Sequence, residues 1–159
     1  MAPTIVTFTD EHMSREYIGW LNNPEIVRYS EQRHIEHDMS TCQQYLAHIR
    51  EVGELWAILV DELHVGNISA HMDWNNRRAD ISIIIGDYQG QGIGPQAIMM
   101  TCDHLKKFGY RKVTMGCMSK NKAMIKAGEK AGFKIEAIRQ GFFIWEKQIV
   151  SLVEMGKSL

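Results

Sequence analysis

The strongest constraint on the fold of this 159-residue chain is a glycine-rich turn, Gln89-Gly90-Gln91-Gly92-Ile93-Gly94. The alternating run 78–86 before it predicts a strand, and the apolar spacing after it, with Pro95 in the first turn, predicts a helix. Glycine lets a backbone approach a ligand closely, and the free N–H groups and dipole of a helix N-terminus favour an anion. The turn therefore predicts an α/β domain with a phosphate-binding loop between a strand and a helix.

Two other kinds of phosphate loop fit this turn poorly. A Walker A loop needs Gly-x4-Gly-Lys-Ser/Thr, and the sequence contains no such run, so NTPase chemistry is excluded. The residues Gly92-x-Gly94-x-x-Ala97 satisfy the relaxed dinucleotide fingerprint, but residues 111–120 lack the acidic residue that would bind the ribose. The turn also follows an expected antiparallel meander instead of opening a βαβ unit. A nucleotide-dependent dehydrogenase is therefore disfavoured.

Length and composition are those of one soluble globular domain, which we place at residues 1–159. Hydrophobic residues make up 45% of the chain and the net charge is −1, so nothing indicates a nucleic acid or an anionic membrane as partner. The three cysteines, Cys42, Cys102 and Cys117, show neither CxxC nor zinc-finger spacing. No apolar run approaches the ~18 residues of a membrane helix, and the first residues lack a signal-peptide pattern, so we expect a cytoplasmic protein.

Local patterns predict a mixed α/β fold in the order β-α-α-β-β-β-α-β-α-β-β. Short neighbouring strands separated by turn residues predict antiparallel pairing in the middle of the chain. Residues 29–38 are polar without a period and predict a loop, and Ser40-Thr41-Cys42-Gln43 fits a helix-capping box. The expected strands are 4–8, 55–60, 65–74, 78–86, 112–118, 133–138 and 142–154. The expected helices run from Asp10 to Leu21, from Ser40 to near Gly53, from the turn to Phe108 and from Asn121 to Ala131.

Motifs spread over nearly the whole chain match those of one known family. They are Trp20–Glu25 (WLNNPE), Gly66-Asn67-Ile68, Arg78-Ala79-Asp80-Ile81 leading to Ile85-Gly86, the Gln89–Gly94 turn, and Asn121 placed 12 positions before Phe133. With these motifs the chain resembles the Gcn5-related N-acetyltransferase (GNAT) superfamily. It is most similar to the branch of ribosomal-protein, spermidine and amino-sugar N-acetyltransferases.

The resemblance implies a mostly antiparallel GNAT sheet flanked by helices, with acetyl-CoA as co-substrate. It implies that the CoA pyrophosphate is held by the backbone amides of Gln89, Gly90, Gln91, Gly92, Ile93 and Gly94. It implies that Ile84 and Ile85 pair with the pantetheine arm as with an added strand. Asn121 would contact the CoA arm or cap its helix, and Lys126 would approach the CoA phosphates or remain solvated.

Acetyl transfer to an amine needs a proton acceptor, because an alkylammonium with a pKa of ~10.4 is only ~0.1% neutral at pH 7. Many relatives carry a Tyr acid seven residues after the asparagine and a Glu base five residues before it. This chain has Gly128 and Gly116 at these positions. Neither family assignment can therefore be carried over.

The remaining catalytic candidates are Asp80 and a row of polar residues that the alternation in 65–74 places on one face of that strand, namely Asn67, Ser69, His71 and Asp73. Among these we single out His71 and Asp80. An imidazole titrates near neutral pH and can act as a base. Alternatively, His71 is a hydrogen-bonded or surface imidazole, and Asp80 is a structural carboxylate paired with a neighbouring arginine. An acetyl-cysteine on Cys117 is disfavoured because buried cysteines are usually inert, and the histidines keep no metal-ligand spacing.

The acceptor surface of the family is built from the N-terminal helices, the loop after them and the central strands. In this chain we expect it to contain Arg28, Arg33, His34 and Trp74. Basic and aromatic groups favour a nucleotide-linked amino sugar as the small-molecule amine, and the stretch 29–34 (YSEQRH) is similar to that of relatives associated with surface polysaccharides. A protein N-terminus, a polyamine and a non-catalytic acyl-CoA-binding module remain alternatives, as do a monomer and a homodimer.

Overall fold

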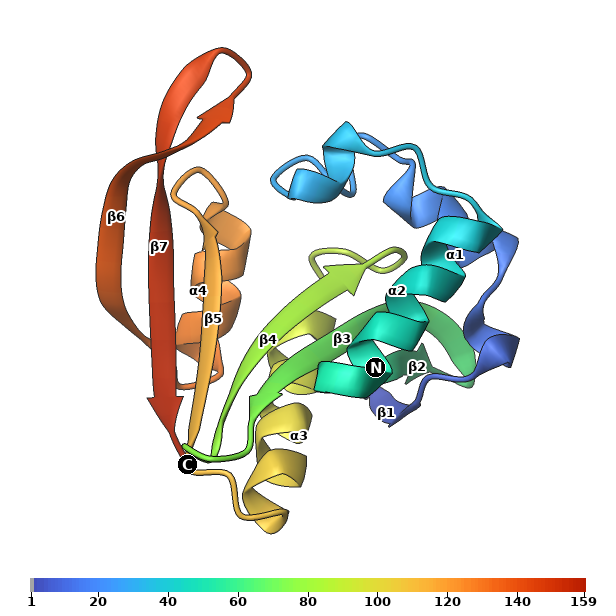
Figure 1. Ribbon diagram of the computed structural model, residues 1–159, viewed down its shortest axis with the longest axis horizontal. Coiled ribbons are helices and arrows are strands. Elements are labelled where there is room, and N and C mark those ends of the chain that lie inside the picture. The colour runs from blue at the N-terminus through green and yellow to red at the C-terminus, as the bar shows by residue number, and fades with distance from the viewer. Residues whose placement is uncertain (1) are drawn as a thin grey trace.

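Seven strands form one sheet with helices on both of its faces (Figure 1). The computed structural model describes residues 2–159. Its strands are β1 (Thr4–Thr7), β2 (Gly53–Val60), β3 (Leu63–Asp73), β4 (Arg78–Ile85), β5 (Lys112–Met118), β6 (Lys134–Trp145) and β7 (Gln148–Ser158). Its helices are η1 (Asp10–His12), α1 (Arg15–Leu21), η2 (Glu31–His34), α2 (Met39–Val52), α3 (Ile93–Lys107) and α4 (Lys122–Lys130), where η marks a 3-10 helix. The predicted α/β class and the predicted order of strands and α-helices are confirmed.

The sheet consists of two antiparallel groups of strands in the order β1-β2-β3-β4-β5-β7-β6. We call β1–β4 the N-terminal half and β5–β7 the C-terminal half. They are joined by one short parallel pairing, Arg78–Asp80 of β4 beside Lys112–Thr114 of β5. Beyond these residues β4 and β5 diverge, so the sheet opens as a V in Figure 1.

Both faces of the N-terminal half are covered. On one face, α3 packs Ile98 and Leu105 against Ile68 and the other inward residues of the sheet. On the other face, α1 and α2 enclose a second core around Phe8. The alternation in β3 predicted one polar face, yet Asn67 of that face is only 3% exposed. Polar side chains of β3 are therefore enclosed beneath α1 and α2.

The helix boundaries differ from the predicted ones in the N-terminal third. The segment 29–38 is not a plain loop, because Ser30 caps the 3-10 helix η2 by accepting from the backbone N–H of Gln32. α2 begins two residues earlier in the polar run than predicted: its cap is Asp38, whose Oδ1 accepts from Thr41 N at 2.8 Å. α1 is capped by Ser14 and not by Asp10, which opens η1. In both α1 and α2, another Ser or Asp close to the predicted cap occupies the capping position.

The prediction of a break between residues 138 and 142 was wrong. β6 runs through this region with an irregularity in register between Arg139 and Phe143, where Gly141 has a φ of +63°. The true turn of the hairpin is Glu146-Lys147, whose φ values are both positive. Gly141 was therefore read as a turn residue although it belongs to a β-bulge.

Gly86, at the end of β4, supports the ring of Trp20. A Cβ atom there would lie 2.0 Å from Cε2 of Trp20. Gly86→Ala should therefore lower the free energy of unfolding by about 2–3 kcal/mol, as overpacked cores do. Gly19→Ala is the control: nothing lies within 4 Å of its Cβ position on α1, so this change should stabilise by up to ~1 kcal/mol. Urea unfolding measures both, and an unchanged midpoint for Gly86→Ala would contradict this packing.

Candidate active site

The glycine-rich turn lies where β4 ends and α3 begins. Gly90 and Gly92 have φ values of +76° and +78°, a left-handed conformation that favours glycine. A Cβ atom on Gly90 or Gly94 would meet nothing within 4 Å, so the backbone is open to an approaching ligand. α3 has 15 residues, and its first turn carries no acidic side chain that would repel an anion. The turn therefore fits the phosphate groups expected there.

The end of β4 provides a free strand edge next to this turn. Ile84 and Ile85 come after the last pairing of β4 with β5. The carbonyl of Ile85 accepts a hydrogen bond from the side-chain amide of Gln89, with 2.8 Å between Nε2 and O. A ligand amide pairing with this edge would take the place of the Gln89 amide. Binding as an added strand therefore requires only a side-chain movement at this carbonyl.

Helix α4 carries two expected ligand residues and one departure from the family. Asn121 caps the helix, since its Oδ1 accepts from Met124 N at 3.2 Å. Lys126 is exposed to solvent on the same helix. At Gly128 a Cβ atom would meet Sδ of Met155 at 2.9 Å. A thioether therefore fills the space into which a tyrosine at this position would project.

His71 and Asp80 lie side by side, because β3 and β4 pair them directly. They line a groove of about 780 Å³ at the closed end of the V. The Asp80 carboxylate accepts a hydrogen bond from Oγ1 of Thr114 at 2.6 Å, whereas Arg78 pairs with Asp73 at 3.0 Å. Partial burial raises the pKa of Asp80, and the Thr114 hydrogen bond and the nearby His71 oppose this rise.

The position of Asp80 limits how it could act as a base. Ile84 stands four residues further along β4, which corresponds to about 13 Å at the rise of an extended strand. Direct proton transfer requires the two atoms to lie within ~3.2 Å, or one bridging water. A reacting amine beside Ile84 would therefore reach His71 or Asp80 only through a chain of waters.

A second polar pair lies closer to the end of β4: the sequence placed Asn67 among the candidates but missed its partner, His64. His64 Nε2 and Asn67 Oδ1 are 2.7 Å apart, and Asn67 is the direct cross-strand neighbour of Ile84. Burial among aromatic rings, including Trp20 at 5.0 Å, lowers the pKa of His64. Among residues 2–159, Asn67 Nδ2 is buried without a hydrogen-bond partner. The polar face predicted for residues 65–74 pointed to Asn67, but His64 lies just before this alternating stretch and was therefore not considered.

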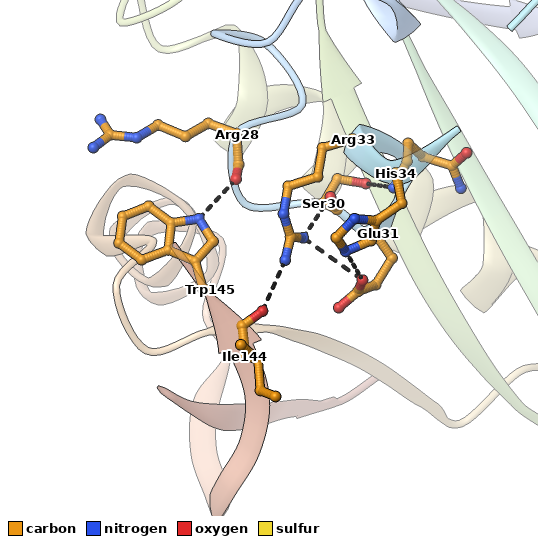
Figure 2. A network of polar contacts seen from close by, with 8 residues as sticks. Arg28, Ser30, Glu31, Arg33, His34, Ile144 and Trp145 are labelled. Atoms are coloured by element: carbon orange, nitrogen blue, oxygen red, sulfur yellow. Dashed lines mark hydrogen bonds and ion pairs between the residues drawn. The ribbon is translucent and has the colours of Figure 1, made fainter. Parts of the chain in front are cut away.

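Three of the four expected acceptor residues come together at the open end of the V. Arg28, Arg33 and His34 line a pocket of about 720 Å³ whose opposite wall is Trp145 of the hairpin between β6 and β7. Figure 2 shows that Arg33 and His34 also contact their own segment, where His34 Nε2 is 3.0 Å from Glu31.

Trp74 does not join this pocket. It follows β3 at the closed end of the V, and its indole is 58% exposed. Its only aromatic neighbour among the described residues is Tyr110, with ring centroids 5.6 Å apart. Trp74 therefore lies outside the pocket that Arg28, Arg33 and His34 line.

Within the part of the chain that the structure describes, no three His, Cys, Asp or Glu side chains gather as metal ligands. In the same residues 2–159, no helix has both the length and the apolar character needed to cross a membrane.

Comparison with known proteins identifies the family. A family model described as the acetyltransferase (GNAT) domain matches residues 4–134. No curated protein sequence matches the chain.

Solved structures share the fold over almost their whole length. Spermidine N-acetyltransferase from Vibrio cholerae, in complex with CoA and spermine, is 17% identical with a TM-score of 0.86, covering 98% of this chain and 95% of that one. The microcin C7 self-immunity acetyltransferase MccE, in complex with acetyl-CoA and AMP, is 18% identical with a TM-score of 0.84, covering 99% and 93%. Ribosomal-protein-alanine N-acetyltransferase from Brucella melitensis is 16% identical with a TM-score of 0.80, covering 98% and 99%.

The opposite pKa shifts of two groove carboxylates predict opposite effects of neutralising them. Because the pKa of Asp80 is raised above 3.8 in the folded protein, its ionisation costs stability as the pH rises. Asp80→Asn should therefore become increasingly more stable than the wild type between pH 4 and pH 7.

Asp73 is the matched control, because hydrogen bonds from Asn76 and Arg78 lower its pKa to about 2. That lowered pKa contributes stability that is present above pH 3.8 and is lost as the pH falls. Asp73→Asn should therefore be less stable than the wild type throughout the same range. Urea unfolding at several pH values tests both, and a constant difference for Asp80→Asn would contradict the raised pKa.

Proposed function

Because the chain belongs to the GNAT acetyltransferase family, as its motifs indicated, we propose that it transfers the acetyl group of acetyl-CoA to a primary amine by direct attack in a ternary complex. The observation that carries this proposal is the divergence of β4 from β5 beside the glycine-rich turn. The turn would hold the pyrophosphate through the amides of residues 89–94. The free edge at Ile84 and Ile85 would pair with the pantetheine arm, which directs the thioester between the two halves.

The state of Cys117 supports direct attack over an acetyl-enzyme. Burial raises the pKa of this thiol to about 11, so it stays protonated at neutral pH. A nucleophilic cysteine needs the thiolate. The amine itself would attack the thioester carbon, and the carbon–sulfur bond would then break to release CoA as its thiolate. The proton of the amine would pass through water toward His71 and Asp80, and water would protonate the thiolate. The oxyanion would be stabilised by a backbone N–H at the end of β4.

We further propose that the acceptor carries an anionic group, as a nucleotide-linked amino sugar does. The guanidinium of Arg28 lies over the rings of Tyr29 and Trp145, 5.2 and 5.4 Å from their centroids. Among residues 2–159, no carboxylate lies within 4.0 Å of it. A preoriented arginine without an ionic partner is suited to bind a phosphate.

A polyamine is the second candidate acceptor, and the groove at the closed end of the V favours it. Four carboxylates line that groove, from Asp73, Asp80, Glu136 and Glu154. Arg78, Lys112 and Arg139 each form an ion pair with one of them, which leaves the carboxylate of Asp80 to attract a cationic acceptor. A protein N-terminus is the third acceptor class. A non-catalytic acyl-CoA-binding module remains the alternative outside enzymes, because Gly128 and Gly116 replace the usual acid and base.

Gly94→Val tests the coenzyme site. Its Cβ position is open in the free protein, so the substitution should leave the unfolding midpoint nearly unchanged. The added methyl groups would block the approach of a phosphate to the amides, and the Kd for CoA should rise about tenfold or more, equivalent to ~1.4 kcal/mol. Calorimetry measures this, and Gly19→Ala on α1 is the control. Unchanged affinity in Gly94→Val would place the pyrophosphate elsewhere.

An acceptor panel tests the activity and its specificity. CoA release from acetyl-CoA should be fastest with a nucleotide-linked amino sugar, compared with spermidine and a peptide that has a free N-terminus. Arg28→Met should raise the KM for the amino sugar by about tenfold or more while leaving the KM for acetyl-CoA unchanged. Faster release with spermidine would favour the polyamine. Tight CoA binding without release for any amine would establish the non-catalytic module.

A further inference from the structure

The pocket at the open end of the V has walls from both halves of the sheet, and a set of contacts crosses between them (Figure 2). We call this set the bridge: the contacts of Arg28, Tyr29 and Arg33 with Ile144 and Trp145. The first three residues follow α1 on the N-terminal half, and the last two end β6 on the C-terminal half. The bridge therefore closes the end of the cleft opposite to the β4–β5 pairing.

Arg33 is the polar centre of the bridge. Its guanidinium donates to the carbonyl of Ser30 at 2.8 Å and, 111 residues along the chain, to the carbonyl of Ile144 at 3.1 Å. Its side chain is only 17% exposed, and Glu31 lies 3.6 Å away. Two of its N–H groups are thus committed to backbone carbonyls, one on each side of the cleft. A group so engaged is poorly placed to bind an acceptor directly.

Trp145 is the apolar centre of the bridge. Its Nε1 donates to the carbonyl of Arg28 at 2.9 Å, and its ring stacks on Tyr29 with centroids 5.2 Å apart. Trp145 is 5% exposed and packs with Met118 of β5 and Val150 of β7. The segment that follows α1 therefore rests on a small core that belongs to the other half.

We infer that Arg33 is a positioning residue, which holds the segment 28–34 against the β6–β7 hairpin and thereby fixes the width of the acceptor pocket. The two halves pair as strands over three residue pairs, and one further backbone hydrogen bond, from Arg111 N to Arg77 O, lies beside them at the same closed end. A contact at the open end of the V lies farthest from this pairing, so its loss should change the distance between the halves the most. This role rests on the proposed function, because it concerns acceptor binding and not the coenzyme turn.

Two measurements on Arg33→Met test the inference. Hydrogen exchange should become faster at amides of 28–36 and of 143–150 together, because both sides lose their shared anchor. In the acceptor assay the KM for the amine should rise about tenfold or kcat should fall by as much, while the Kd for CoA stays unchanged. Arg50→Met is the matched control, since Arg50 also donates to a backbone carbonyl, Phe8 O at 3.4 Å, but within the N-terminal half.

Trp145→Phe is the second variant in case Arg33→Met folds poorly. It keeps an aromatic ring on Tyr29 but loses the donor to Arg28, and it should move both measurements in the same direction. Unchanged exchange on either side of the cleft would overturn the bridge as an anchor. Faster exchange with unaltered acceptor kinetics would overturn its positioning role. A wild type that transfers acetyl to no amine would reject the proposed function, and the exchange data would still decide whether the anchor exists.

Discussion

The architecture depends on how briefly β4 and β5 pair. Parallel strands normally continue side by side, but here the hydrogen bonds stop after Asp80 and Thr114. Beyond this pairing the strands of the two halves diverge, while α3 on the N-terminal half and α4 on β5 contact each other and share one core. The glycine-rich turn, the free edge of β4 and both pockets all lie around the resulting gap. If β4 and β5 paired along their whole length, no gap would remain between the two halves of the sheet beside the turn.

Features fixed by short stretches of sequence could be predicted, and features fixed by distant contacts could not. The turn, the meander and most helices follow from local glycine, β-branched and apolar patterns. The β6 bulge was misread because Gly141 has the same local signature as a turn residue. The contact of Arg33 with Ile144 joins residues 111 positions apart, and no local pattern encodes such a pair. Trp74 was grouped with the arginines because the acceptor surface of the family includes the central strands, but it follows β3 outside the pocket that they line.

The two pockets differ in charge although the whole chain is nearly neutral, with a net charge of −1. The pocket at the open end holds the Arg28 guanidinium, with Glu36 and Glu146 also in its lining, whereas the groove at the closed end holds the carboxylate of Asp80, which has no ion pair among the described residues. An acceptor that spans the gap would meet a positive group at one end and a negative group at the other. Such a gradient would orient a molecule that has both an ammonium and an anionic group.

The Gln89 side chain covers the carbonyl of Ile85 on the part of the β4 edge that pairs with no strand. An unpaired strand edge is a template on which other polypeptides can add, and natural proteins usually shield such edges. In the proposed function the β4 edge pairs with the pantetheine arm, so a permanent cover would prevent this pairing. The side-chain amide of Gln89 covers the carbonyl of Ile85 reversibly, because a rotation of this side chain exposes the edge again. The carbonyl oxygen of Ile85 thus has a hydrogen-bond partner when no ligand is bound, and this part of the strand edge is less open to pairing with another molecule of the protein.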